Sequence, residues 1–133
     1  MGMVIELTSG ALATLREEAT RAHPRECCGL LLGQGARIVS AVPAANVHPD
    51  AERHFEIDPA ALIAAHRAAR AGGPHVLGYY HSHPNGRAEP SGEDIVMAER
   101  AGRIWAIIAA GNVLLWRDGA EGFTALSSRV VDG

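Results

Sequence analysis

The spacing of apolar and polar residues along the 133-residue chain predicts three helices. After Thr8, apolar residues recur at helical spacing with acidic residues between them, so an amphipathic helix is predicted that stops before Pro24. Asp58, followed by a proline, is a helix-start signal and predicts a second helix over residues 60–71. A third helix is predicted over about residues 91–101, where a serine with an acidic residue three positions later resembles a capping box.

Short apolar runs bounded by turn-forming residues predict the strands, which cover residues 27–32, 37–42, 75–80, 104–110, 113–117 and 123–126. The first two runs predict a hairpin around Gly35, and the Gly111-Asn112 pair is a strong turn signal for a second hairpin. The last run is expected to add an edge strand. This order of elements implies an α/β fold in which one mixed β-sheet is flanked by helices.

The chain length fits a single domain, predicted over residues 1–133 with a core over about residues 4–127. A hydrophobic share of 47% with 20% charged residues is that of an ordinary globular protein. The net charge is -3 and no stretch gathers lysine and arginine, which argues against a nucleic-acid partner. The chain has neither a signal-like start nor a long apolar run, so a cytoplasmic protein that does not bind membranes is expected.

The candidate chemistry lies in the stretch His81-Ser82-His83-Pro84 and in Asp94 further along the chain. Residues two apart on an extended segment point to the same side, so His81 and His83 can offer ring nitrogens to one zinc ion. Asp94, in the first turn of the predicted third helix, can supply the third ligand. Two histidines and one carboxylate leave a coordination position open, which is typical of a catalytic zinc site and not of a structural one.

A catalytic zinc ion lowers the pKa of a bound water toward about 7 and polarises a substrate carbonyl, so one zinc ion per chain would suit hydrolysis. A base must still accept the proton from the attacking water. The spacing of the ligands does not choose among the acidic residues that could do so.

These residues resemble the motif of the JAMM, or MPN, metalloproteases, in which an upstream Glu precedes His-x-His-Pro and Ser-x-x-Asp. The elements of this motif are Glu26, the His81 to Pro84 run, Ser91 and Asp94. The Glu-Cys-Cys-Gly-Leu run and the Gly-Tyr-Tyr run before the histidines also look familial, and the resemblance covers about residues 7–126. It implies that Glu26 is the general base and acid, and that Ser91 stabilises the oxyanion of the tetrahedral intermediate.

The resemblance also implies a fold like that of the cytidine deaminases and a particular substrate. The short chain is most similar to bacterial stand-alone members, which are associated with ubiquitin-like sulfur-carrier proteins. The expected partner is therefore such a carrier or its C-terminal adduct, cleaved at the peptide or isopeptide bond after Gly-Gly. Exposed strand edges would support a homodimer without requiring one.

Three other functions remain open at this point. Some MPN domains are non-catalytic scaffolds, although a scaffold would not need Glu26 and Ser91. A zinc nucleoside deaminase would carry His-x-Glu and Pro-Cys-x-x-Cys, which the chain lacks. A cysteine peptidase could use Cys27 or Cys28, yet these adjacent cysteines are expected to be small buried residues in a reducing compartment, one of them near the metal.

Several residues are predicted to surround the site without taking part in the chemistry. Asn46 and His48 fall in a loop where relatives shape the substrate cleft. The large aromatic residues are expected to pack in or beside the sheet, and those near the site could line the groove; they are Tyr79, Tyr80, Trp105 and Trp116. The histidines without a partner at metal spacing are interpreted as surface or structural residues: His23, His48, His54, His66 and His75.

Overall fold

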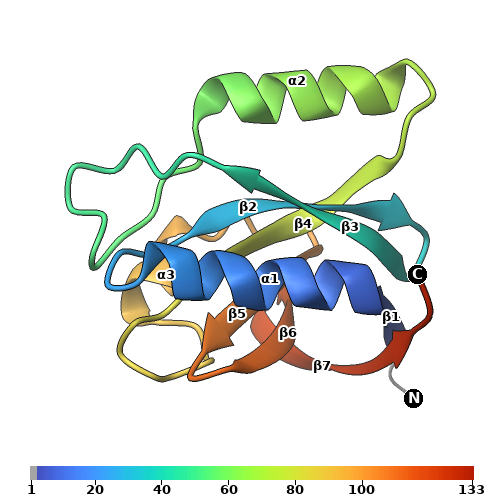
Figure 1. Ribbon diagram of the computed structural model, residues 1–133. Coiled ribbons are helices and arrows are strands. Elements are labelled where there is room, and N and C mark those ends of the chain that lie inside the picture. The colour runs from blue at the N-terminus through green and yellow to red at the C-terminus, as the bar shows by residue number, and fades with distance from the viewer. Residues whose placement is uncertain (1–2) are drawn as a thin grey trace.

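The computed structural model describes residues 3–133, which form seven strands and three helices (Figure 1). The helices are α1 (Ser9–Ala22), α2 (Pro59–Arg70) and α3 (Gly92–Met97). The strands are β1 (Val4–Thr8), β2 (Cys28–Gln34), β3 (Arg37–Ala44), β4 (His75–Ser82), β5 (Arg103–Ala109), β6 (Asn112–Gly119) and β7 (Gly122–Val131). The predicted α/β class and the predicted hairpins β2–β3 and β5–β6 are therefore confirmed.

The sheet is mixed, as predicted, but it closes on itself as a barrel in the order β1-β3-β2-β4-β5-β6-β7. Strand β4 runs parallel to β5, and β1 runs parallel to both β3 and β7. The prediction of a short edge strand at 123–126 is wrong, because β7 is ten residues long and pairs with β6 on one side and β1 on the other. Closure pairs the two end strands β1 and β7 with each other, so it removes both edges that an open sheet would offer to a second copy.

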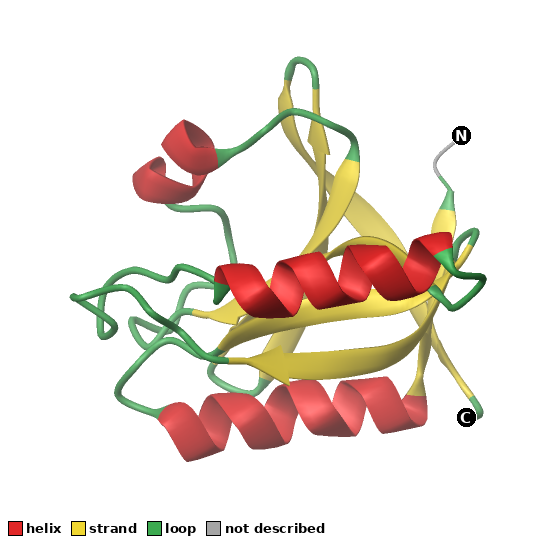
Figure 2. Ribbon diagram, turned by 90° about the horizontal axis from the view of Figure 1, so that it is seen from above, coloured by secondary structure: helices red, strands yellow, loops and turns green. Residues whose placement is uncertain are grey.

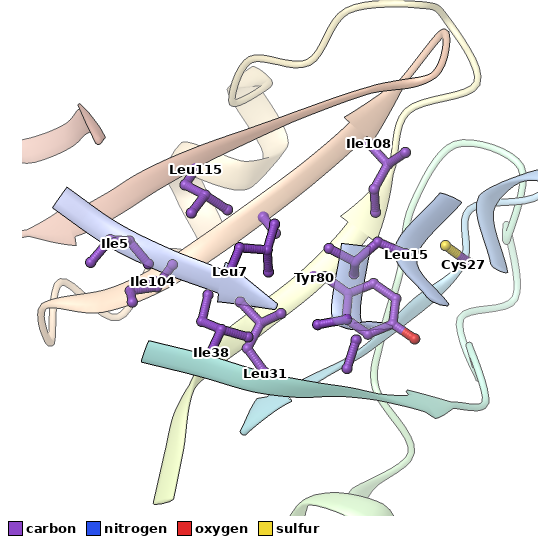
Figure 3. Close-up of a cluster of buried hydrophobic side chains, with 13 residues drawn as sticks. Ile5, Leu7, Leu15, Cys27, Leu31, Ile38, Tyr80, Ile104, Ile108 and Leu115 are labelled. Atoms are coloured by element: carbon purple, nitrogen blue, oxygen red, sulfur yellow. The ribbon is translucent and has the colours of Figure 1, made fainter. Parts of the chain in front are cut away.

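The barrel interior is the hydrophobic core (Figure 3). Ile5 and Leu7 on β1 point inward while Glu6 between them is partly exposed, so β1 follows the period-2 pattern of a half-buried strand. Helix α1 contributes Ala11 and Leu15 to this core. It contacts β1 and each of the strands from β3 to β7. Helix α2 lies outside the barrel against β4, with no fully buried residue (Figure 1).

Helix α3 begins as predicted but ends early, at Met97 instead of about residue 101. Arg100 has a left-handed backbone with φ of 58°, which a continuing helix does not allow. Its N–H donates to both carboxylate oxygens of the buried Asp118, each at 3.1 Å. This turn replaces the expected last turn of the helix, and the ribbon of α3 lies to one side of the ribbons of the strands and the longer helices (Figure 2).

In the described part of the chain, no helix has the length and apolar character needed to cross a membrane.

Candidate metal centre

Strand β4 presents His81 on the outer face of the barrel. Tyr80 points into the core, so its neighbours Tyr79 and His81 face the opposite side of the sheet. His81 is fully buried and pairs with Ile107 of the parallel strand β5. The N–H of His83 donates to the carbonyl of Ile108 at 2.8 Å, which continues the extended course of the chain beyond β4.

The three predicted ligands converge in this structure. The Nε2 atoms of His81 and His83 lie 2.9 Å apart, and Oδ2 of Asp94 lies 3.2 Å and 3.1 Å from them. Donors bound tetrahedrally at roughly 2.0–2.1 Å from zinc would lie about 3.3 Å from one another. The spacing of the three groups therefore fits a single ion between them.

Asp94 is aimed at the histidines by the capping box of α3. The side chain of Ser91 accepts from the Asp94 N–H at 3.0 Å, while the Ser91 N–H donates to Oδ2 of Asp94 at 2.9 Å. These reciprocal bonds turn the carboxylate back toward the end of β4. The capping box predicted at Ser91 and Asp94 is therefore confirmed, and the same bonds place the Asp94 carboxylate beside the histidines.

The donor set has the chemistry of a cation site. The Nδ1–H of His83 donates to the carbonyl of Arg87 at 2.7 Å, which leaves the Nε2 lone pair facing the centre. Burial would raise the pKa of Asp94, but its hydrogen bonds to the two imidazoles outweigh burial and lower that pKa. Burial lowers the pKa of His81, whereas for His83 the bonds to Asp94 and Arg87 overcome burial and raise it. The residues thus favour a positive charge held between them, as a zinc ion would be.

Glu26 is brought to this centre by strand pairing. Cys27, the next residue, donates its N–H to Oγ of Ser82 at 2.8 Å and accepts from the Ser82 N–H at 3.1 Å. Glu26 is 7% exposed, and a carboxylate oxygen of it lies within 4.8 Å of one ring nitrogen of each histidine. Burial raises its pKa to about 7; His83 counters this shift and Asp94 adds to it. Asp94, which is hydrogen-bonded to Nε2 of His81 and lies 3.1 Å from Nε2 of His83, is the direct partner of the two histidines, and Glu26 stands beside this group.

A cleft of about 330 Å³ opens beside Glu26, Ser91 and Asp94. Tyr79 and Trp105 line it from β4 and β5, as the sequence allowed for aromatic residues near the site. His48, predicted to lie in a substrate-contacting loop, lines the cleft as well. Met97 lines it from α3.

Asn46 lies behind the cleft instead of in its lining. Its Nδ2 group donates to the carbonyls of Glu26 and His54, both at 3.0 Å. Its Oδ1 atom accepts from the N–H groups of His48 at 3.1 Å and Glu56 at 3.0 Å. The side chain therefore holds the 46–57 loop in shape and ties it to the backbone of Glu26.

The sequence missed His54 and Phe55 as site residues. Both line the cleft, and the Phe55 ring stacks on His81 with centroids 4.1 Å apart. His54 was interpreted as a surface or structural residue, yet its Nδ1 lies 3.8 Å from a carboxylate oxygen of Glu93 on α3. No spacing in the sequence joins this loop to β4, so only the fold reveals the contact.

Cys27 and Cys28 are buried, as predicted. Burial raises the pKa of both thiols, that of Cys28 to about 12. The Cys28 thiol lies 3.6 Å from the carbonyl oxygen of Ala45. A protonated, enclosed thiol is a poor nucleophile, which disfavours the cysteine peptidase.

Comparison with known proteins gives the chain a family. Residues 8–119 match the family model of the prokaryotic homologues of the JAB domain. A probable TtuB-protein conjugate cleaving protease of Thermus thermophilus is 37% identical over 94 residues, which are 71% of this chain but 63% of the relative. The chain therefore spans less than two thirds of that relative. A desampylase of Haloferax volcanii is 31% identical over 109 residues, covering 80% of this chain and 78% of the relative.

The fold agrees with that match. A solution structure of a protein from Desulfitobacterium hafniense, 27% identical, superposes with a TM-score of 0.85 and covers 98% of this chain and 94% of that one. Because the family model spans most of the described residues, this chain belongs to the prokaryotic homologues of the JAB domain.

Proposed function

We propose that the protein is a zinc-dependent peptidase that hydrolyses the peptide or isopeptide bond after the C-terminal Gly-Gly of a ubiquitin-like sulfur-carrier protein. The observation that carries this proposal is the convergence of His81, His83 and Asp94 next to the Glu26 carboxylate at the cleft. The names of two relatives, one a protease for TtuB conjugates and one a desampylase, support a ubiquitin-like substrate.

One zinc ion per chain would be held by Nε2 of His81, Nε2 of His83 and the carboxylate of Asp94. When bound, zinc would supply a water of lowered pKa and polarise the substrate carbonyl. The other steps belong to side chains of this protein. The bond from His83 to the Arg87 carbonyl holds that imidazole in the required tautomer.

Glu26 would accept the proton of the attacking water and return it to the leaving amine. Its carboxylate is close enough to the imidazole donors to reach a solvent molecule between them. Burial, which raises its pKa to about 7, makes the carboxyl group both a usable base and a usable acid near neutral pH.

Ser91 would donate its hydroxyl hydrogen to the oxygen of the scissile carbonyl as negative charge develops there. Its Oγ atom already accepts from the Asp94 N–H, so the hydroxyl hydrogen is directed elsewhere. Ser91 lines the same cleft as Glu26, and removal of such a donor typically costs about 3–4 kcal/mol of transition-state stabilisation.

The cleft also fits the proposed substrate. Its lining is partly aromatic, with the rings of Tyr79 and Trp105 contributed by β4 and β5. A Gly-Gly segment has no side chains to exclude, so its backbone can pass close to these rings. The residues beyond Gly-Gly would lie on the far side of the scissile bond.

The test is hydrolysis of a ubiquitin-like carrier that bears one extra residue after Gly-Gly, with products read by mass spectrometry. Glu26→Gln should keep zinc, measured by elemental analysis, and lose turnover. His81→Ala and Asp94→Ala should lose both zinc and turnover. Full turnover by Glu26→Gln would reject Glu26 as the base, and a zinc-free wild-type protein would favour a non-catalytic scaffold.

Inhibitors separate the proposal from a cysteine peptidase. Turnover should stop with a zinc chelator and continue with a thiol-alkylating agent, because both thiols are buried and protonated. A cytoplasmic location, a homodimer and a likeness to cytidine deaminases stay predictions beside this proposal.

A further inference from the structure

The two histidines of the candidate centre are held in different ways. His83 donates from Nδ1 to the carbonyl of Arg87 at 2.7 Å. Nδ1 of His81 is buried and finds no hydrogen-bond partner within residues 3–133. A metal-binding histidine almost always donates its second ring N–H to a partner that sets the orientation of the ring. Something else must therefore orient His81.

Two aromatic rings, those of Phe55 and Trp105, pack against the His81 imidazole. The Phe55 ring lies nearly parallel to the imidazole, with an interplanar angle of 16° and centroids 4.1 Å apart. Trp105 meets the imidazole at 83° with centroids 5.6 Å apart. Phe55 and Trp105 also contact each other, at 82° and 6.1 Å. The plane of the His81 ring is thus set by one stacked and one perpendicular neighbour.

We propose that Phe55 is a positioning residue for the metal centre: its ring orients the His81 imidazole in place of the missing hydrogen bond. The inference rests on the proposed zinc site and concerns only the side chains that shape it. Offset-stacked aromatic pairs are favoured beyond the area they bury, because the edge and face of the rings carry opposite partial charge. The stack also covers one face of a fully buried imidazole.

The position of Phe55 is itself fixed by Asn46. The residues on either side of Phe55 are bound by the Asn46 side chain, through the carbonyl of His54 and the N–H of Glu56. The same side chain binds the carbonyl of Glu26. The 46–57 loop therefore lines the cleft and, through Phe55, bears on a metal ligand. A substrate that shifts this loop would also shift the orientation of His81.

The size of the effect follows from the stack. Aromatic pairs contribute about 0.5–1.5 kcal/mol beyond burial, which corresponds to about a twofold to twelvefold change in an affinity. Loss of the stack should therefore weaken zinc binding by about that factor. Loss of the stack should also change the geometry of the metal ligands. Zinc has no absorption bands that report this geometry, whereas bound cobalt does.

The experiment measures zinc affinity by competition with a chromophoric chelator, and the absorption spectrum of the cobalt-substituted protein. Phe55→Leu and Phe55→Met remove the ring but keep an apolar side chain, and Phe55→Tyr keeps the ring. Phe123→Leu is the matched control, because Phe123 contacts Trp105 at 4.9 Å and is not among the rings stacked on His81. Thermal unfolding of the metal-free forms checks that each variant folds.

Both ring-removing variants should bind zinc about twofold to twelvefold more weakly and shift the cobalt bands, while Phe55→Tyr and Phe123→Leu should resemble wild type. Unchanged zinc affinity and cobalt spectrum in folded Phe55→Leu and Phe55→Met would overturn the inference. An equal loss of zinc affinity in Phe123→Leu would also overturn it, since the loss would then reflect a general weakening of the packing around the site. Wild-type protein that binds zinc but never cleaves a carrier would overturn the proposed function alone.

Discussion

Replacement of Asn46 by alanine removes a side chain whose hydrogen-bonding capacity is fully used. An asparagine amide offers two N–H donors and two acceptor lone pairs, and each of these meets a backbone group here. The bonds span 3.0–3.1 Å; three of them lie within the 46–57 loop and the fourth ties it to Glu26, two residues before β2. Asn46→Ala leaves four backbone groups to find water or stay unpaired.

The expected loss is about 2–4 kcal/mol in the free energy of unfolding. A single hydrogen bond contributes about 0.5–1.5 kcal/mol net, and some of the released groups are exposed enough to be solvated. Asn46→Asp serves as the matched variant, since it keeps both acceptor bonds and loses both donor bonds. It also places a carboxylate against the carbonyls of Glu26 and His54, so its loss in stability can approach that of Asn46→Ala.

Urea unfolding of the chelator-treated proteins measures the loss without stabilisation from bound metal. Amide hydrogen exchange then distinguishes the bonds accepted by Oδ1 of Asn46 from those donated by its Nδ2 group. Protection of the His48 and Glu56 N–H groups should disappear in Asn46→Ala and persist in Asn46→Asp, because only Asp keeps the acceptor. A change below about 0.5 kcal/mol in Asn46→Ala, or unaltered protection of those two amides, would refute the reasoning.

Three further outcomes are expected. Because the pKa of Glu26 is raised from 4.5 to about 7, the folded metal-free protein holds a proton that the unfolded chain releases, so the free energy of unfolding should fall as pH rises through this window. The free energy of unfolding should fall by at most about 3 kcal/mol, measured by denaturation of the wild type at about pH 5 and about pH 8. The same comparison for Glu26→Gln should show no such fall. Gly78→Ala should destabilise by about 3 kcal/mol in urea unfolding, because its Cβ would overlap the Ile104 carbonyl on β5, whereas Gly92→Ala has open space and should not. A zinc chelator should lower the thermal midpoint of wild type and leave that of His81→Ala unchanged, because zinc stabilises only a folded protein that binds it.

The sequence alone determined those features that depend on neighbours along the chain. The cap at Asp58, the turn at Gly111 and the capping box at Ser91 each involve residues within a few positions of one another. The shared side of His81 and His83 follows from the two-residue repeat of an extended segment, and their ring nitrogens do meet. Such local rules need no knowledge of the rest of the fold.

The family resemblance reached further, to Glu26. Its placement beside the histidines depends on the pairing of Cys27 with Ser82, across the antiparallel strands β2 and β4. No rule of spacing connects positions so far apart in the chain. The family motif therefore predicted Glu26, and the strand pairing explains why it lies beside His81 and His83.

Only the tertiary structure decided the closure of the sheet, the early end of α3 and the role of the 46–57 loop. Strand β1 is short, and it pairs with β7 while its own inner face, Ile5 and Leu7, is buried in the core. Arg100 leaves the helical conformation because Asp118, on β6, binds its N–H. Phe55 reaches His81 because Asn46 folds the loop over the site. Each of these outcomes depends on groups distant in sequence whose interaction energies exist only after the chain has closed around its core.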